Sequence, residues 1–260
     1  MAEPEDDPIH DKPMPLLEHL VELRSRLLWA MVSFVVSFFA GYYFSERIYG
    51  ILAAPVAHAL EARGQIPHMI FTGLTEGFFT YVKVGMFAAA FISFPVVATQ
   101  LWLFVAPGLY RSEKRAMLPF LAATPVLFFL GASLAYFFVF PVAMAFFLGF
   151  QTPVGSGSGV EISAELRVGE YLDFVMRLVL AFGVAFQLPV ALSLMAKVGI
   201  VTSKGLSKFR RYAIVCVFVF AAIIAPPDVI TQIGLAIPLM LLYELSILAA
   251  RIVEPKVSET

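Results

Sequence analysis

Two segments of the sequence place acidic side chains beside long apolar runs, where ionised carboxylates are available to hold cationic groups. In residues 15–28, Glu18, Glu22 and Arg26 recur every four residues on one helical face, and leucines form a stripe on another. A surface helix whose Glu22–Arg26 pair adds a few tenths of a kcal/mol explains the stripe. It does not explain why two glutamates point outward.

The second segment, residues 104–115, contains one acid, Glu113, among the basic side chains Arg111, Lys114 and Arg115. By itself, such a loop glutamate is most simply a solvated charge paired with one of these cations. Neither segment is accompanied by a phosphate-binding glycine loop, a metal-ligand spacing or a nucleophile motif. We therefore expect no enzyme activity, no cofactor and no metal site.

The composition indicates that lipid is the main solvent of this chain. Hydrophobic residues make up 60% of its 260 residues and charged residues 14%, against about 45–50% and 25% in an average soluble domain. A soluble protein of this size has no way to bury so much apolar surface. The net charge of −1 gives no argument for a nucleic-acid partner.

The apolar runs predict one all-α membrane domain over residues 14–253, between an acidic tail, 1–13, and a C-terminal tail, 254–260. The predicted spans are about six: 27–44, 84–105, 118–140, 174–196, 212–225 and 229–250. After the third span, Pro141 is expected to start a separate interfacial helix. The last two spans are short, so the fifth either crosses a thinned membrane or forms a re-entrant hairpin with the sixth.

Basic residues predict the orientation of these spans. Of the 18 Lys and Arg residues, 13 fall in the segments that would share one side with both termini, which favours cytoplasmic termini and six crossings. The opposite side holds two longer segments, 45–77 and 151–170. Four prolines inside spans are expected to bend their helices: Pro95, Pro125, Pro189 and Pro238.

Few polar side chains interrupt the spans. Gln187 is a candidate for a hydrogen bond to a partner helix or, equally, to a neighbouring helix of the same chain. Glu244 is expected to pair with Arg251 near the cytoplasmic interface, to snorkel, or to contact a partner helix.

Charges are also expected on the outer side. Asp228 lies in the turn between the last two spans and is predicted to cap the sixth helix. Asp173 and Arg177 are spaced as an i,i+4 pair at the outer end of the fourth span.

Two motifs resemble the signatures of the TatC family, whose members are the polytopic core of the twin-arginine protein translocase. The first is His19-Leu-Val-Glu-Leu-Arg-Ser-Arg-Leu27, and the second is Phe104-Val-Ala-Pro-Gly-Leu-Tyr110 followed by Glu113-Lys-Arg115. The resemblance extends over residues 14–253 and includes the span count, the short final pair and the Pro-Pro-Asp turn.

The resemblance implies that Glu22 and Glu113 bind the paired arginines of signal peptides. Fixed carboxylates suit this task because a planar guanidinium forms paired, charge-assisted hydrogen bonds that an ammonium does not reproduce. Arg24 and His19 match the same motif, and Arg24 is expected to position the carboxylates. The supporting residues of the second motif are Phe104, Pro107, Leu109, Tyr110 and Arg115. The family commonly has a glutamate where this chain has Gln187, so a role needing a titratable group there is not carried over.

The resemblance also implies a signal-peptide receptor and scaffold that exports folded proteins across the bacterial inner membrane, driven by the proton-motive force. Its expected partners are small single-span proteins of the TatA and TatB type, with several copies of this chain in one hetero-complex. The alternative is a proton-coupled secondary transporter of a small solute. That function predicts internal repeats and ionisable groups near the membrane midplane, and the sequence shows neither.

Overall fold

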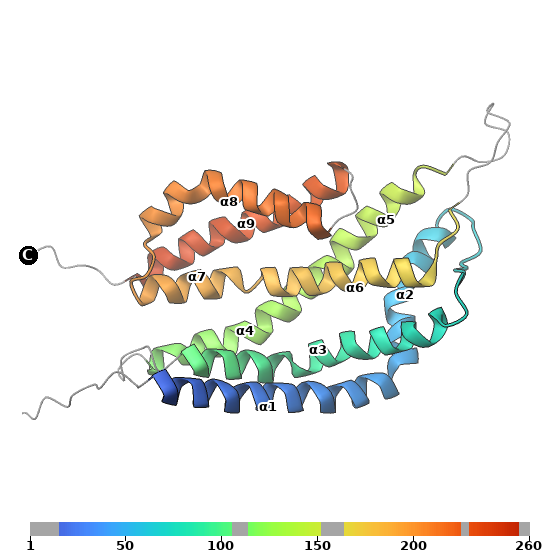
Figure 1. The fold of residues 1–260 in the computed structure, drawn as a ribbon. Helices are drawn as coiled ribbons and strands as arrows, with labels where there is room; N and C mark the ends of the chain where they lie inside the picture. The colour runs from blue at the N-terminus through green and yellow to red at the C-terminus, as the bar shows by residue number, and fades with distance from the viewer. Residues whose placement is uncertain (1–15, 106–113, 152–163, 225–228, 255–260) are drawn as a thin grey trace, which may run out of the picture.

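The computed structural model describes residues 16–105, 114–151, 164–224 and 229–254 (Figure 1). Within these ranges the chain is helical apart from short connections and one isolated bridge between Ile70 and Arg167, which confirms the all-α prediction. The helices are α1 Leu16–Tyr43, α2 Ser45–Glu61, α3 Glu76–Val105, α4 Lys114–Leu134, η3 Ala135–Val139, α5 Phe140–Leu148, α6 Val168–Ala185, α7 Leu188–Lys197, α8 Ser203–Ile224 and α9 Val229–Val253.

Five helical stretches in the described residues are long and apolar enough to cross a membrane: His19–Tyr43, Glu76–Phe104, Pro119–Leu148, Val168–Lys197 and Thr231–Val253. The helix α8 lies outside this set because Lys204, Lys208, Arg210 and Arg211 occupy its first half. The helix α8 is longer than the apolar run 212–225 that was predicted as the fifth span. The helix begins at Ser203, before the apolar run, and its 22 residues extend about 33 Å. Six crossings stay a prediction.

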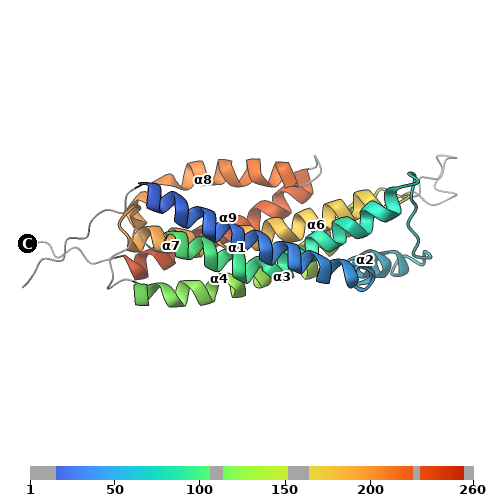
Figure 2. The same cartoon turned by 60° about the horizontal axis from the view of Figure 1, so that its bottom comes forward.

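The helices α1, α3, α6 and α7 run roughly along one axis, and the segment from α4 to α5 crosses them obliquely (Figures 1 and 2). We call the end where α1 begins and α9 finishes the near end. The far end holds α2 and the starts of α3 and α6. The stretch Val168–Lys197 lies inside the bundle, and half of the residues in its most apolar part are buried. In the first stretch, His19–Tyr43, only 6% of the corresponding residues are buried. The helix α1 is therefore a peripheral element.

Glycines let α1 approach α3 closely. A Cβ atom at Gly41 would lie 2.7 Å from the Cβ of Ala88 and 2.8 Å from the carbonyl oxygen of Gly85. A Cβ at Gly85 would in turn lie 3.1 Å from the Cα of Tyr42. Small residues at such crossings allow backbone packing in lipid, where no hydrophobic effect drives helices together. We call this contact the glycine seam.

Prolines alter the helices in two different ways. Pro189 removes the hydrogen bond that the Ala185 carbonyl would accept, and α6 ends at Ala185 before α7 resumes at Leu188. Pro141 was expected to end the third span, and this was wrong. The helix continues to Leu148 through the π-helical turn η3, which directly precedes the proline. A widened turn accommodates the missing N–H without breaking the helix.

The helix α2 occupies a segment that the sequence presented only as a long outer connection, and it is anchored to η3. Pro55 lies inside α2 and leaves the Ile51 carbonyl without its helical donor. The Tyr136 hydroxyl donates to that carbonyl oxygen at 2.5 Å. The second anchor of α2 is Tyr171, whose hydroxyl donates to the Leu52 carbonyl oxygen at 2.6 Å.

Replacing Tyr136 with Phe is expected to destabilise the protein by about 1–3 kcal/mol, because the Ile51 carbonyl then has neither a helical nor a side-chain donor. In a Pro55→Ala background the restored N–H supplies that donor, so the same Tyr136→Phe change is expected to cost much less. Thermal unfolding of the four variants of this cycle in one detergent measures the difference. Equal costs in both backgrounds would contradict this account of Tyr136.

Candidate functional site

The near end brings the two sequence motifs into contact, although they are separated by most of α1 and α3. The His19 ring from α1 stacks on the Phe104 ring from the end of α3, with centroids 4.3 Å apart and an interplanar angle of 16°. This contact is worth about 0.5–1.5 kcal/mol beyond simple burial. It places the first motif beside the residue that opens the second.

Glu22 is held by its own helix. Its Oε1 accepts hydrogen bonds from Arg26 Nε at 2.9 Å and from Nη2 at 2.5 Å, which realises the predicted i,i+4 pair. Arg26 Nη1 also donates to Gln100 Oε1 on α3 at 3.4 Å. The second carboxylate oxygen, Oε2, lies 4.0 Å from His19 Nδ1 and accepts no hydrogen bond from the described residues. Glu22 therefore keeps one oxygen available for a ligand.

Arg24 is exposed and forms no hydrogen bond or ion pair with the part of the chain that the structure describes. Its positioning role stays a prediction, because Glu113 lies outside the described residues. Glu22 itself is oriented by Arg26, as the spacing indicated. The remaining residues of the second motif, Pro107, Leu109, Tyr110 and Glu113, lie outside the described residues, and Arg115 falls in the first turn of α4.

Gln187 lies where α6 gives way to α7, and its amide joins helices of this chain. Its Nε2 donates to the Thr124 carbonyl oxygen on α4 at 3.1 Å and to the Gly183 carbonyl oxygen at 3.4 Å. Thr124 Oγ1 in turn accepts a hydrogen bond from Trp102 Nε1 on α3 at 2.9 Å. The observed geometry matches the interhelical alternative for Gln187.

Glu244 pairs with a residue of the neighbouring helix α8. Arg210 of α8 donates from Nε to Glu244 Oε1 at 2.7 Å and from Nη2 to Oε2 at 2.9 Å, whereas the sequence had offered Arg251 as one of three alternatives for Glu244. The two hydrogen bonds between this arginine and this carboxylate link α8 to α9 in their near-end halves. Asp228, predicted to cap α9, lies outside the described residues.

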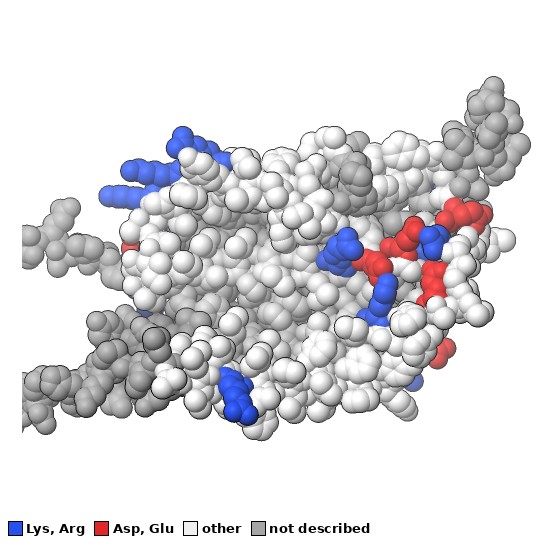
Figure 3. All heavy atoms as spheres, viewed as in Figure 1, with Lys and Arg blue, Asp and Glu red and all other residues white. Residues whose placement is uncertain are grey.

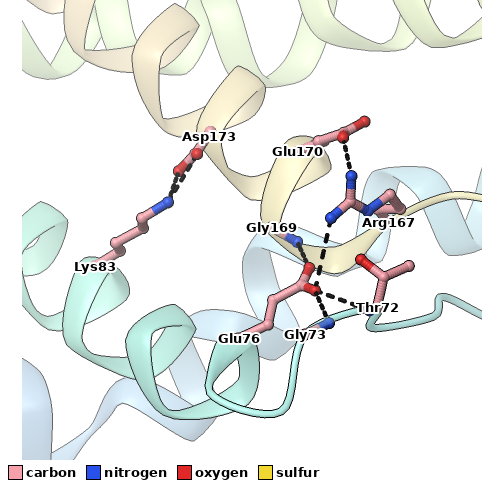
Figure 4. Close-up of polar contacts among 8 residues, drawn as sticks. All are labelled: Thr72, Gly73, Glu76, Lys83, Arg167, Gly169, Glu170 and Asp173. Carbon is pink, nitrogen blue, oxygen red and sulfur yellow. Dashed lines mark hydrogen bonds and ion pairs between the residues drawn. The ribbon is translucent and has the colours of Figure 1, made fainter.

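Charges of both signs gather at the far end, and basic side chains stand out at the opposite end, where α8 begins (Figure 3). Asp173 does not pair with Arg177, as its spacing suggested. Both carboxylate oxygens of Asp173 accept from Lys83 Nζ at 2.8 Å, which links α6 to α3 (Figure 4). Sequence spacing could not show this link because the two residues are 90 positions apart.

Glu76 is the centre of the far-end cluster, and we did not identify it from the sequence. Its Oε2 accepts from the backbone N–H groups of Thr72 at 2.9 Å and Gly73 at 3.2 Å, and its Oε1 accepts from Gly169 at 3.0 Å (Figure 4). Arg167 lies 4.0 Å away and also pairs with Glu170. A glutamate that begins a helix and reaches back three residues resembles half of a capping box, which is the signal that the sequence offered.

The comparisons with known proteins agree with this architecture. The model of the family described as "Sec-independent protein translocase protein (TatC)" matches residues 18–238. The chain belongs to the TatC family. It is 51% identical to the TatC of Magnetococcus marinus, over 94% of this chain and 87% of that protein. It is 40% identical to the TatC of Aquifex aeolicus, over 95% and 98% respectively.

Solved structures of TatC share the fold. A crystal structure titled "Twin Arginine Translocase Receptor- TatC" superposes with a TM-score of 0.78 at 40% identity, and the match covers 90% of this chain and 99% of that one. A second crystal structure of the receptor, in detergent, gives a TM-score of 0.77. This TatC chain is therefore a multi-pass membrane protein and a component of a protein translocase, and it is not an enzyme.

Replacing Glu76 with Gln in this TatC is expected to lower the unfolding temperature clearly, because one amide oxygen would replace two charged oxygens that serve three N–H groups. The control is Glu170→Gln, at an exposed carboxylate paired only with Arg167, which is expected to cost less than about 1 kcal/mol. Thermal unfolding of both variants in detergent gives the comparison. Equal losses would show that Glu76 is not the centre of this cluster.

Proposed function

We propose that this TatC chain is the receptor for twin-arginine signal peptides, which it binds at the near end through Glu22 and Glu113. The observation that carries the proposal is the stacking of His19 on Phe104, because it joins the Glu22 motif to the motif that contains Glu113. Glu113 directly precedes Lys114, the first residue of α4, in the sequence. In Figure 1, α4 starts at the same end at which α3 finishes.

The chemistry of Glu22 suits a guest arginine. Arg26 occupies one carboxylate oxygen from the side of the helix and leaves the other without a hydrogen-bond donor among the described residues. A guest guanidinium binds that second oxygen, and Glu113 supplies the carboxylate for the neighbouring arginine. Two consecutive arginines then meet two acidic side chains, and guanidinium geometry favours arginine over lysine at each.

The same proposal includes the rest of the export machinery. The chain acts as a scaffold for folded proteins, in complexes with small single-span partners of the TatA and TatB type and further copies of itself. The apolar face of α1, with Trp29, Val32, Val36 and Phe39 more than half exposed, supports such assembly within lipid. The proton-motive force is the proposed energy source.

The proposed orientation places the near end in the cytoplasm and the protein in the bacterial cytoplasmic membrane. The near end carries the basic residues of α8, including Lys204 and Lys208, as the positive-inside rule requires. The far end carries acids and bases in similar numbers around Glu76 and Asp173.

Glu22→Gln and Glu113→Gln are each expected to weaken binding of a twin-arginine signal peptide roughly ten-fold or more, since each removes a charge-assisted contact worth about 1.5–3 kcal/mol. Site-specific crosslinking of the peptide to membranes that contain each variant measures this. The control is Glu165→Gln, which alters an exposed far-end carboxylate. Undiminished crosslinking and export in both near-end variants would refute the recognition role.

The orientation has its own test, in a Cys216→Ala background that removes the exposed native thiol. A Leu74→Cys variant places a thiol at a fully exposed far-end position, and Ser25→Cys places one on the exposed surface near the start of α1. A membrane-impermeant maleimide is expected to label Leu74→Cys in intact spheroplasts and Ser25→Cys only after the membrane is opened. The reverse pattern would invert the proposed topology.

A further inference from the structure

A groove of about 630 Å³ separates α2 from the continuous helix formed by α4, η3 and α5. Its walls are mostly small or apolar, and two basic side chains contribute to it. The lining residues are Ala54, Pro55, His58, Ala59, Ala62, Arg63, Tyr136, Phe137, Pro141 and Ala145. The near-end site shares none of these residues.

The position of the groove along the bundle places it at the membrane surface. The helical stretch Pro119–Leu148 has 30 residues and extends about 45 Å, whereas the hydrocarbon core is about 30 Å thick. A helix needs about 20 residues to cross that thickness, and 20 residues counted from Pro119 end within η3. Phe137 and Phe138, at that level, are 66% and 68% exposed, as expected for side chains that face acyl chains. The groove therefore extends from the hydrocarbon edge into the headgroup layer.

The charge of the groove favours a phosphate. Arg63 Nη2 donates to the Ala145 carbonyl oxygen at 2.9 Å, which keeps the guanidinium over the groove and leaves most of its N–H groups available. His58 lies in the last turn of α2 and also lines the groove, where a ring N–H offers a further hydrogen-bond donor. Neither Asp nor Glu is among the residues that line the groove.

A lipid fits this groove better than a polypeptide does. The polar groups of two lining residues are already engaged: the Tyr136 hydroxyl donates to the Ile51 carbonyl oxygen, and the Ala145 carbonyl oxygen accepts from Arg63. An inserted backbone would find few partners for its own N–H groups there. An acyl chain needs none, and the alanines together with Phe137 offer it an apolar wall.

We propose that this groove binds one anionic phospholipid of the leaflet on the far side. Its phosphate lies between Arg63 and His58, and an acyl chain runs along Tyr136 and Phe137 toward the hydrocarbon core. The bound lipid fills the groove beside the Tyr136–Ile51 hydrogen bond, which already holds α2 against η3. The proposal requires only that the chain spans a bilayer, and it is independent of signal-peptide binding.

Native mass spectrometry of the full chain in mild detergent, with phosphatidylglycerol or phosphatidylcholine added, tests the proposal. We expect one phosphatidylglycerol molecule to remain bound under activation that removes phosphatidylcholine. Arg63→Gln is expected to lower the retained fraction about ten-fold, as the loss of one charge-assisted contact predicts. The matched control is Arg47→Gln, which removes a basic side chain of α2 that lies outside the groove and is expected to retain the lipid.

Two tryptophan substitutions distinguish lipid bound in the groove from lipid that associates with the protein elsewhere. Ala145→Trp fills the groove without changing its charge and is expected to abolish the retained lipid. Val142→Trp, at an exposed position of the same helix but outside the groove, is expected to leave it bound. Equal retention in the wild type, Arg63→Gln and Ala145→Trp would overturn the proposal. So would displacement of the lipid by millimolar inorganic phosphate, or a peptide bound in its place.

Discussion

The fold depends on one constraint: a backbone carbonyl inside a membrane protein must find its donor within the protein. Each proline within a helix leaves one backbone carbonyl without its helical donor, so a side chain from a neighbouring helix has to supply a donor. The Tyr136 hydroxyl reaches the carbonyl that Pro55 leaves open on α2. At the break between α6 and α7, the Gln187 side chain donates to the carbonyl oxygens of Gly183 and Thr124, which differ from the Ala185 carbonyl that Pro189 leaves open, and so ties α6 to α4. These contacts satisfy the backbone and also fix how the helices are arranged around each other.

Sequence patterns predicted the helices of this fold better than its contacts. Apolar runs located the spans because lipid exposure and burial both select the same residue types. They missed the full length of α8, since its basic first half is helical without being apolar. The helix α2 was also missed, because its helical identity depends on packing against η3 and α6 through two tyrosine hydroxyls. The π-helical turn before Pro141 had no distinct sequence signal.

The polar contacts show the same difference: pairs within one helix were predictable from the sequence, and pairs between helices were not. The Glu22–Arg26 pair was visible in the spacing because both side chains lie one turn apart on a single helix. Partners on the same helix were offered for Asp173 and, as one alternative, for Glu244, and the observed partners lie on neighbouring helices. Local spacing describes which groups can pair within one helix, but the packing of helices brings other partners within reach. The stacking of His19 on Phe104 likewise required the register of α1 on α3.

That register gives the glycine seam a further meaning. With no Cβ at Gly41 or Gly85, α1 and α3 touch backbone to backbone, so sliding one helix along the other by a residue would bring side chains into collision. Gly41 and Glu22 are 19 residues apart on one helix, which corresponds to about 28 Å. The glycine seam therefore fixes the axial position of α1 on α3. Because the seam has no room for an added methyl group, it also sets how far along the bundle α1 presents the Glu22 carboxylate at the near end.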